Sequence, residues 1–262
     1  MDLELRGKVA LVTGASRGIG RGIALGLAAE GVHLVLCARG ADELEAAAAE
    51  VRGLGVEAET VALDVTEPDA AGRLVATARE RFGRLDVVVG NVGGNRRMPF
   101  AETTDEDWSA LLDLNFLSHA RTVRAALPLL PGRRDERDGG VVVLVSSIFG
   151  REAGGPELTI YNSTKSALIS LAKILSLELA PKGVRVLTVC PGSILFPGGS
   201  WQRRQEKDPE GIAEFIEQNL PFGRFGTVEE VADVVTFLCS PRASLVTGAA
   251  VTVDGGQSRS LI

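Results

Sequence analysis

The sequence predicts an α/β fold: a doubly wound, seven-stranded parallel sheet with helices on both faces, as a single domain over residues 1–262. Short apolar runs alternate with longer amphipathic ones along the chain, which is the order of strands joined by crossover helices. The apolar runs are continuous in Val and Leu, so both faces of each strand should be buried. No linker or repeat divides the chain.

Each predicted element follows from its local pattern. The strands are expected at 8–14, 33–39, 57–65, 85–93, 140–147, 184–192 and 249–256. The helices are expected at 18–30, 41–53, 67–82, 105–130, 161–181 and 227–239. The charged segment 131–140 is predicted to be a solvated loop. Residues 193–226 are irregular and too long for a simple connection, which indicates a substrate lid.

Composition and charge exclude several function classes. The formal net charge is -6, so we expect no nucleic-acid partner. No apolar run approaches the length of a membrane span, and the N-terminal segment carries acids where a signal peptide needs basic residues. We therefore expect no membrane association and a cytoplasmic protein. The cysteines Cys37, Cys190 and Cys239 lie in apolar contexts and are expected to be reduced core thiols.

A glycine-rich turn follows the first strand in "VALVTGASRGIG". Glycines let backbone N–H groups approach a pyrophosphate, and the N-terminus of the next helix presents positive partial charge to it. The alternative is a tight strand-to-helix turn without a ligand. The position after the first strand favours a dinucleotide site. Its candidate residues are Gly14, Ser16, Arg17, Gly18, Ile19 and Gly20.

The end of the second strand, "LVLCARG", indicates which dinucleotide is bound. Folds that prefer NAD usually place an acid here for the ribose 2′-hydroxyl. This chain offers Arg39 and no carboxylate until Asp42. A guanidinium suits a 2′-phosphate, and Arg17 adds a second positive charge. NADP(H) is therefore predicted in preference to NAD(H), the alternative being two solvated surface arginines.

The motifs occur in the order typical of the short-chain dehydrogenase/reductase family, which this sequence resembles along essentially its whole length. They are "TGASRGIG", "LDV", "NVGG", "DLNFLSHA", "SS", "YNSTK", "CPG" and the tail that ends "VTVDGG". The overall pattern is most similar to 3-oxoacyl-[acyl-carrier-protein] reductases. The resemblance implies a Rossmann fold and an NAD(P)-dependent oxidoreductase that interconverts a ketone and a secondary alcohol.

The resemblance also implies the catalytic residues. Tyr161 would be the general acid/base, with Lys165 one helical turn away on the same face. The Lys165 ammonium and an oxidised nicotinamide are expected to lower the pKa of Tyr161, and Lys165 to bind the nicotinamide ribose. Ser147 would polarise the substrate carbonyl, and Asn115 would hold a helix kink and a relay water. Without the surrounding motifs, Tyr161 reads as an ordinary amphipathic helix residue.

Further cofactor contacts are implied on the same basis. They come from Asp64, Val65, Asn91, Val92, Gly93, Tyr161, Lys165, Pro191, Gly192 and Ile194. Asp64 would contact the adenine, and the last three would lie beside the nicotinamide.

Three departures from the family pattern stand out. Ser147 fits the S-x-x-G pattern better than Ser146, yet Tyr161 follows it by 14 positions, one more than usual, which indicates an insertion in "REAGGPELTI". Gly90 replaces a side chain that commonly braces the neighbouring strand. Phe196 replaces a frequent threonine, so one cofactor hydrogen bond is expected to be absent or supplied by Ser193 or Ser200.

The substrate and assembly are less constrained. The lid carries Phe196, Trp201 and Phe215 beside Arg203, Arg204 and Lys207. These side chains suit an acyl thioester, and the alternative is an amphipathic lid with solvated cations. A 3-oxoacyl thioester is thus one candidate substrate, and sugars, polyols and steroids are the alternatives.

A non-catalytic NADP-binding regulator is disfavoured by the presence of both Tyr161 and Lys165. His33 and His119 lack spaced partner ligands, so no metal site is expected. A homotetramer is expected by family analogy.

Overall fold

The structure, a computed structural model, describes residues 1–132 and 139–261 and confirms the predicted fold. One sheet has the strand order β3-β2-β1-β4-β5-β6-β7, and all neighbouring strands are parallel. The strands are β1 (Val9–Thr13), β2 (His33–Ala38), β3 (Ala58–Ala62), β4 (Val87–Gly90), β5 (Val141–Val145), β6 (Arg185–Pro191) and β7 (Ala250–Val253). Each lies within its predicted run.

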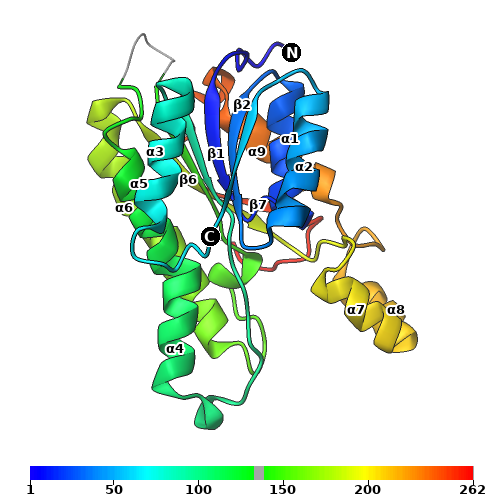
Figure 1. Cartoon of the computed structure of the whole chain (residues 1–262). Helices are drawn as coiled ribbons and strands as arrows, with labels where there is room; N and C mark the ends of the chain where they lie inside the picture. Colours follow the sequence, from blue (N-terminus) through cyan, green and yellow to red (C-terminus); the bar gives the residue numbers. More distant parts are fainter. Residues whose placement is uncertain (133–138, 262) are drawn as a thin grey trace.

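Helices cover both faces of the sheet (Figure 1). On one face lie α1 (Gly18–Ala29), α2 (Ala41–Gly53) and α9 (Val228–Cys239), and on the other α3 (Ala70–Phe82), α5 (Ser118–Ala126) and α6 (Thr159–Leu179). Strand residues alternate between the two buried clusters. In β1, Ala10 and Val12 face the first cluster, while Val9 and Leu11 face the second. Burial on both faces explains the continuous apolar runs.

Two predicted segments differ from the structure. The expected helix 105–130 is divided into α4 (Asp105–Leu112), a π-helical turn (Asp113–Leu117) and α5. The expected irregular lid contains α7 (Ser200–Lys207) and α8 (Pro209–Asn219), which form a hairpin with its own apolar cluster. The charged loop predicted at 131–140 falls mainly on residues 133–138, which lie outside the described residues.

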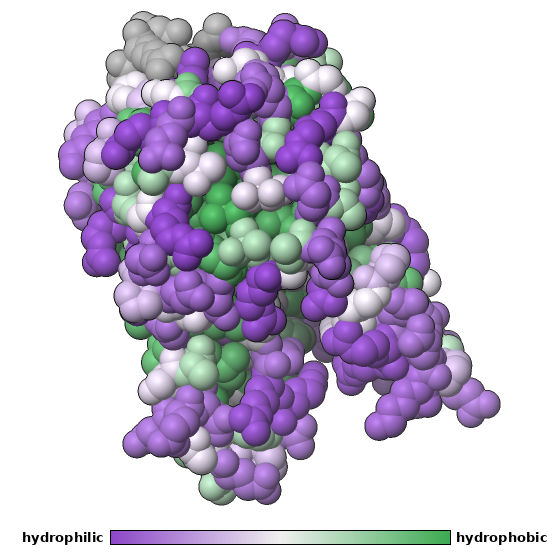
Figure 2. Space-filling model, in the orientation of Figure 1, coloured by the Kyte–Doolittle hydropathy of each residue, from purple (hydrophilic) through white to green (hydrophobic). Residues whose placement is uncertain are grey.

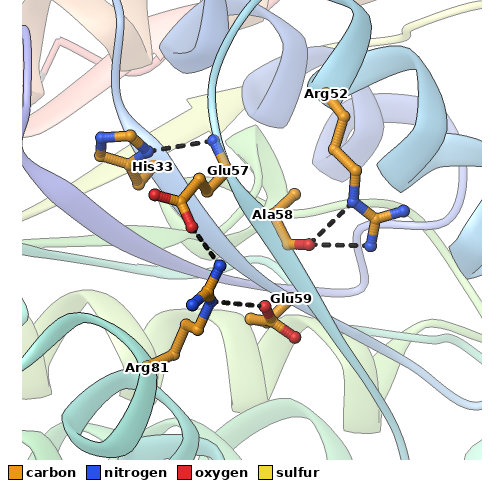
Figure 3. A network of polar contacts seen from close by, with 6 residues as sticks. All are labelled: His33, Arg52, Glu57, Ala58, Glu59 and Arg81. Carbon is orange, nitrogen blue, oxygen red and sulfur yellow. Dashed lines mark hydrogen bonds and ion pairs between the residues drawn. The ribbon is translucent and has the colours of Figure 1, made fainter.

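Charged side chains clamp the edge strand β3 (Figure 3). Arg52 of α2 donates from Nε and Nη2 to the carbonyl oxygen of Ala58, at 3.0 and 2.8 Å. Arg81 of α3 pairs with Glu57, and the Glu57 backbone N–H donates to His33 Nδ1 at 3.0 Å. Both helical layers therefore hold this edge, which protects it from pairing with other strands.

Cys37, Cys190 and Cys239 are free and buried, which confirms the expected reduced thiols. Within residues 1–132 and 139–261, no helix has the length and apolar character needed to cross a membrane.

Candidate active site

The carboxyl ends of the strands form one edge of the sheet, and α4 and the α7–α8 hairpin project from that side (Figure 1). Figure 2 shows a hollow between these two projections. Loops at this edge of a parallel sheet commonly bind ligands. Every predicted site residue lies on a segment at or just beyond this edge.

The glycine turn after β1 leaves the start of α1 open. A Cβ on Gly20 would lie 2.1 Å from the carbonyl oxygen of Gly14, so only glycine fits there. Arg17 occupies the N-cap of α1 without a capping hydrogen bond, and the first turn contains no acid. By contrast, Thr227 and Glu230 form a capping box at the start of α9. The uncapped N–H groups of α1 therefore fit a phosphate-bearing cofactor.

Arg39 and Asp64 lie side by side at the ends of β2 and β3. Arg39 Nη1 is 3.9 Å from Asp64 Oδ2, and its side chain is 80% exposed. No carboxylate follows Arg39 in the sequence until Asp42, but the parallel register brings Asp64 at the end of the next strand beside it. Asp64 also accepts hydrogen bonds from the N–H and hydroxyl of Thr66, and these bonds hold its pKa below the usual value.

Asn91 ties the end of β4 to the glycine turn. Its Nδ2 donates to the carbonyl oxygens of Thr13 and Gly14 at 3.1 and 3.2 Å. Its backbone N–H donates to Thr13 Oγ1 at 3.1 Å. The structure therefore assigns Asn91 a bracing position, and Thr13 is a partner that sequence reasoning missed.

Asn115 joins three segments at the candidate site. It is fully buried in the π-helical turn, which gives the implied helix kink a physical form. Its Oδ1 accepts from the N–H of Gly94 at 2.8 Å, and its Nδ2 donates to Gly94 O at 2.9 Å and to Thr164 Oγ1 at 3.2 Å. Thr164, inside "YNSTK", is a second partner missed from the sequence. A Cβ on Gly93 would lie 3.4 Å from Asn115 Oδ1, so the turn after β4 contacts this group directly.

Lys165 is buried, 3% exposed, and its Nζ donates to the carbonyl oxygen of Val145 at 2.9 Å. Burial lowers its pKa from 10.5 to about 8. The ammonium is 5.8 Å from the ring centre of Tyr161. It also lies 3.1 Å from the position of a Cβ on Gly93, so it faces the turn after β4. Lys165 is thus held between the candidate acid and the turn after β4, which is expected to contact the cofactor.

Ser147 acts on the pKa of Tyr161. Burial raises the pKa of Tyr161, and its hydrogen bond with Ser147 opposes that rise. Lys165 is not among the causes of this shift in the chain alone, and the predicted lowering by Lys165 together with an oxidised nicotinamide stays a prediction. Ser147 Oγ also accepts from the N–H of Phe149 at 3.2 Å. Ser146 Oγ donates to the carbonyl oxygen of Lys165 at 2.9 Å, so this serine has a structural hydrogen bond.

His119 fills the space left by Gly90. A Cβ on Gly90 would lie 2.4 Å from His119 Nδ1 and 2.8 Å from Leu144 Cδ2. The other ring nitrogen, Nε2, is 2.8 Å from the carbonyl oxygen of Val92. Burial is the main cause that lowers the pKa of His119 to about 3, so the ring is neutral. The bracing role expected to be lost at position 90 is thus supplied by a histidine from α5.

Phe196 lies directly on the glycine turn. Its ring carbon Cε2 is 2.7 Å from the position of a Cβ on Gly18, whose φ of +54° already favours glycine. Arg17 Nη1 is 3.6 Å from the corresponding position on Gly198. The base of the lid therefore packs on the turn predicted to bind the pyrophosphate.

The lid aromatics mainly contact one another. Trp201 stacks on Phe215 with ring centres 4.6 Å apart, and Arg204 lies 4.7 Å over the Trp201 ring. Phe225 completes the group, with its ring centre 5.0 Å from that of Trp201. This arrangement supports the alternative of an amphipathic lid with its own core.

A pocket of about 570 Å³ lies between the segment after β5 and the lid. Its wall includes Ile148 and Phe149, which follow Ser147 directly, and residues 217–221 of the lid. The remaining wall comes from Phe215, from the loop 152–154 and from the chain after β7. A substrate in this pocket would approach Ser147 from the side of the lid.

Several implied cofactor residues contribute their side chains to the core. Val65 and Ile194 are buried in the two core clusters, and Ile19 and Val92 pack against them. Ile194 also forms a backbone bridge with Gly226. Pro191 ends β6, and the N–H of Gly192 donates to Val253 at 3.0 Å. For Ile19, Val65, Val92 and Ile194, the side chains support the sheet edge, and the backbone remains the candidate contact for a cofactor.

The fold and this edge define the class of protein: a nicotinamide-dependent dehydrogenase or reductase. A family model described as enoyl-(acyl carrier protein) reductase matches residues 14–258, and the chain belongs to the short-chain dehydrogenase/reductase family. It is 34% identical over 257 residues to the oxidoreductase UcpA of Escherichia coli strain K12, covering 97% of this chain and 96% of that protein. It is also 34% identical over 254 residues to the 3-oxoacyl-[acyl-carrier-protein] reductase FabG of Thermotoga maritima, covering 97% and 99%.

Among solved structures, the chain is similar to L-sorbose reductase from Gluconobacter frateurii complexed with NADPH and L-sorbose. The TM-score is 0.92 at 35% identity, and both chains are covered completely.

Proposed function

We propose that this enzyme interconverts a ketone and a secondary alcohol with Ser147, Tyr161, Lys165 and Asn115 as its catalytic group. The observation that carries the proposal is that three of these side chains lie close together. The Ser147 side chain acts on the pKa of Tyr161, and Lys165 Nζ lies 5.8 Å from the centre of the Tyr161 ring. The pocket of about 570 Å³ is lined by Ile148 and Phe149, the two residues that follow Ser147.

The role of each residue follows from its chemistry. When bound, the nicotinamide cofactor supplies or accepts the hydride. In reduction, the Tyr161 hydroxyl gives its proton to the carbonyl oxygen, and the raised pKa keeps that proton available at neutral pH. The Ser147 hydroxyl donates a hydrogen bond to the same oxygen. Lys165 offers a donor to a nicotinamide ribose, and Asn115 keeps the turn after β4 in place.

The preferred cofactor in this proposal is NADP(H). Arg39 is 80% exposed at the end of β2, and Arg17 is exposed in the glycine turn. Both guanidinium groups can reach a 2′-phosphate. The structural similarity to a reductase bound to NADPH supports the same choice.

The cofactor proposal is tested by the ratio of kcat/KM for NADPH to that for NADH. Arg39→Ala should lower this ratio by roughly tenfold or more. Arg242→Ala, at an exposed pair with Glu4 in a different part of the chain, is the matched control. An unchanged ratio in Arg39→Ala would contradict the role of Arg39.

The proposed substrate is a neutral polyhydroxy ketone. The pocket wall mixes acceptors and donors: the carboxylates of Glu152 and Glu217, the amides of Gln218 and Asn219, and the guanidinium of Arg259. Sugar hydroxyls can satisfy both kinds of group. The similarity to L-sorbose reductase favours the same class.

A 3-oxoacyl thioester is the second candidate substrate. The 34% identity to FabG supports it, but the carboxylates in the pocket wall do not favour an anionic carrier group. The test is NADPH oxidation with L-sorbose and with acetoacetyl-CoA at matched concentrations. Faster turnover of L-sorbose supports the polyhydroxy class, and faster turnover of acetoacetyl-CoA supports the thioester.

We also propose a homotetramer. Apolar side chains are exposed on two separate surfaces, with Ile174 and Leu177 of α6 on one and Phe237 and Leu245 near β7 on the other. Two self-complementary interfaces are what a tetramer with dihedral symmetry requires.

A further inference from the structure

The segment after β7 is fastened to the body of the enzyme at several points. In Figure 1 the segment after β7, coloured red, turns back beneath the sheet. Asp254 caps this turn, because its carboxylate accepts from the N–H of Gly256 at 3.0 Å and of Ser258 at 2.7 Å. Hydrogen bonds within residues 254–258 therefore set the conformation of this turn, independently of contacts with the lid.

Gln257 connects this segment to the base of the lid. Its Oε1 accepts from the N–H of Ser193 at 2.8 Å, and its Nε2 donates to Ser193 Oγ at 3.0 Å. Ser193 is buried, so this pair of hydrogen bonds is shielded from water. Ser193, the first residue of the lid, and Gln257 thus each donate one hydrogen bond to the other.

Glu152 provides the second anchor. Its Oε2 accepts from the N–H of Arg259 at 2.7 Å and from the N–H of Ser260 at 3.0 Å. Glu152 belongs to the segment "REAGGPELTI", where the spacing to Tyr161 is one residue longer than the family pattern. The loop that departs from the family pattern is therefore the loop that holds the chain after β7.

The two residues that hold the chain after β7, Gln257 and Glu152, both border the pocket. Gln257, Arg259 and Glu152 line it, together with Phe149. Among the residues that line it, Arg259 is the one cation. Its guanidinium forms no ion pair within the described part of the chain, so its five N–H donors are available to a ligand.

We propose that residues 257–260 form a wall of the substrate pocket, anchored by Glu152, in which Arg259 binds the hydroxyl groups of a polyhydroxy ketone. This proposal rests on the proposed function and names the part of the pocket that selects the substrate. Arg259 donates to substrate hydroxyl oxygens, and the carboxylate of Glu217 accepts from the hydroxyl protons. Arg259 is a specificity residue, and Glu152 is a positioning residue that acts through it.

The anchor is tested by hydrogen exchange, which does not depend on turnover. The Arg259 and Ser260 amides should be protected in the native enzyme and should exchange several-fold faster in Glu152→Gln, since the amide is a weaker acceptor than the carboxylate. Glu157→Gln, an exposed acid on the same loop, is the matched control. Exchange at unprotected rates in the native enzyme would overturn the anchor.

The wall is tested by steady-state kinetics with L-sorbose and NADPH. Arg259→Ala should raise KM for L-sorbose by roughly tenfold and leave the Kd for NADPH unchanged, because the contact is made by the substrate alone. Glu152→Gln should change KM in the same direction by a smaller factor. An unchanged KM for L-sorbose in Arg259→Ala would overturn the wall. A larger increase in KM for an anionic ketone, such as 5-keto-D-gluconate, than for L-sorbose would also overturn it, because Arg259 would then bind a carboxylate rather than hydroxyl groups.

Failure of the proposed function gives a different result. If the native enzyme binds NADPH and reduces neither L-sorbose nor 5-keto-D-gluconate, the substrate class is wrong and the assignment of Arg259 to hydroxyl recognition is overturned with it. Protection of the Arg259 and Ser260 amides that depends on Glu152 would still support the anchor.

Discussion

Gly90 and His119 show how a departure at one residue is compensated by another. The imidazole occupies the position that a Cβ at residue 90 would take, 2.4 Å from Nδ1. It also contacts the carbonyl oxygen of Val92 at 2.8 Å. The pair therefore braces β4 against α5 in a way that neither residue could achieve alone.

This pairing predicts non-additive stabilities. Gly90→Ala should destabilise the native protein by roughly 1–3 kcal/mol, because the methyl group enters a filled space. The same substitution should cost clearly less in a His119→Ala background, where only the Leu144 contact remains. Urea unfolding of the four proteins gives the interaction free energy. Equal costs in both backgrounds would show that the two residues are independent.

The lowered pKa of the buried Lys165 predicts how the free energy of unfolding depends on pH. Its pKa is about 8 in the folded chain and 10.5 when unperturbed, so the unfolded chain binds more protons between these values. The unfolding free energy contributed by this group therefore rises with pH from about 8 to about 10.5 and is constant below that window. The difference in unfolding free energy between native protein and Lys165→Met should show this rise. A fall over the same window would contradict the assignment.

At this scale, the sequence predicted that Tyr161 and Lys165 share one face of a helix, but it did not predict the environment that sets their pKa values. The spacing of "YNSTK" brings Tyr161 and Lys165 to one face of α6, as helix geometry requires. The direction of the Tyr161 pKa shift could not be predicted, because it depends on burial by segments distant in sequence. Two further contacts could not be predicted, because each joins neighbouring parallel strands. They are the contact of Arg39 with Asp64 and that of Asn91 with Thr13.

The lid is the element that differs most from its sequence-based prediction. Pro197, Gly198 and Gly199 interrupt helical periodicity, so the following helices were not expected. The α7–α8 hairpin nevertheless forms, because Trp201, Phe215 and Phe225 bury one another. Its stability comes from tertiary contacts rather than from local helix propensity.

The contact of the Phe196 ring with Gly18 is expected to hold the base of this lid in place. Phe196→Ala should therefore loosen the base of the hairpin. Trypsin should then cleave after Arg203 and Arg204 several-fold faster, because local opening becomes less costly. Leu195→Ala, at the more exposed neighbouring residue, is the control. Equal cleavage rates in the two variants would show that Phe196 does not hold the lid.

For the whole molecule, the sequence predicted strand number, strand direction and helix layers. The apolar runs are long, and burial on both faces leaves one consistent arrangement. The sequence did not predict how the chain after β7 reaches the pocket. That contact depends on Glu152 and Gln257, whose hydrogen-bonding partners are distant in sequence.

The proposed assembly predicts a mass about four times the chain mass of 27.5 kDa in light scattering after size-exclusion chromatography. Leu177→Glu should reduce that mass, because a charge would enter an apolar interface. Leu54→Glu places the same charge at an exposed apolar residue on α2's end and should leave the mass unchanged. A native mass equal to one chain would contradict the proposal.

The central claim is that Tyr161 transfers the proton that accompanies hydride transfer. The most direct measurement is single-turnover NADPH oxidation with saturating L-sorbose, comparing the native enzyme with Tyr161→Phe. We expect the variant to bind NADPH with an unchanged Kd and to lose roughly 10²–10⁴-fold in rate, the usual contribution of a general acid. A variant that binds NADPH normally and reduces L-sorbose within a few-fold of the native rate would contradict the assignment of Tyr161.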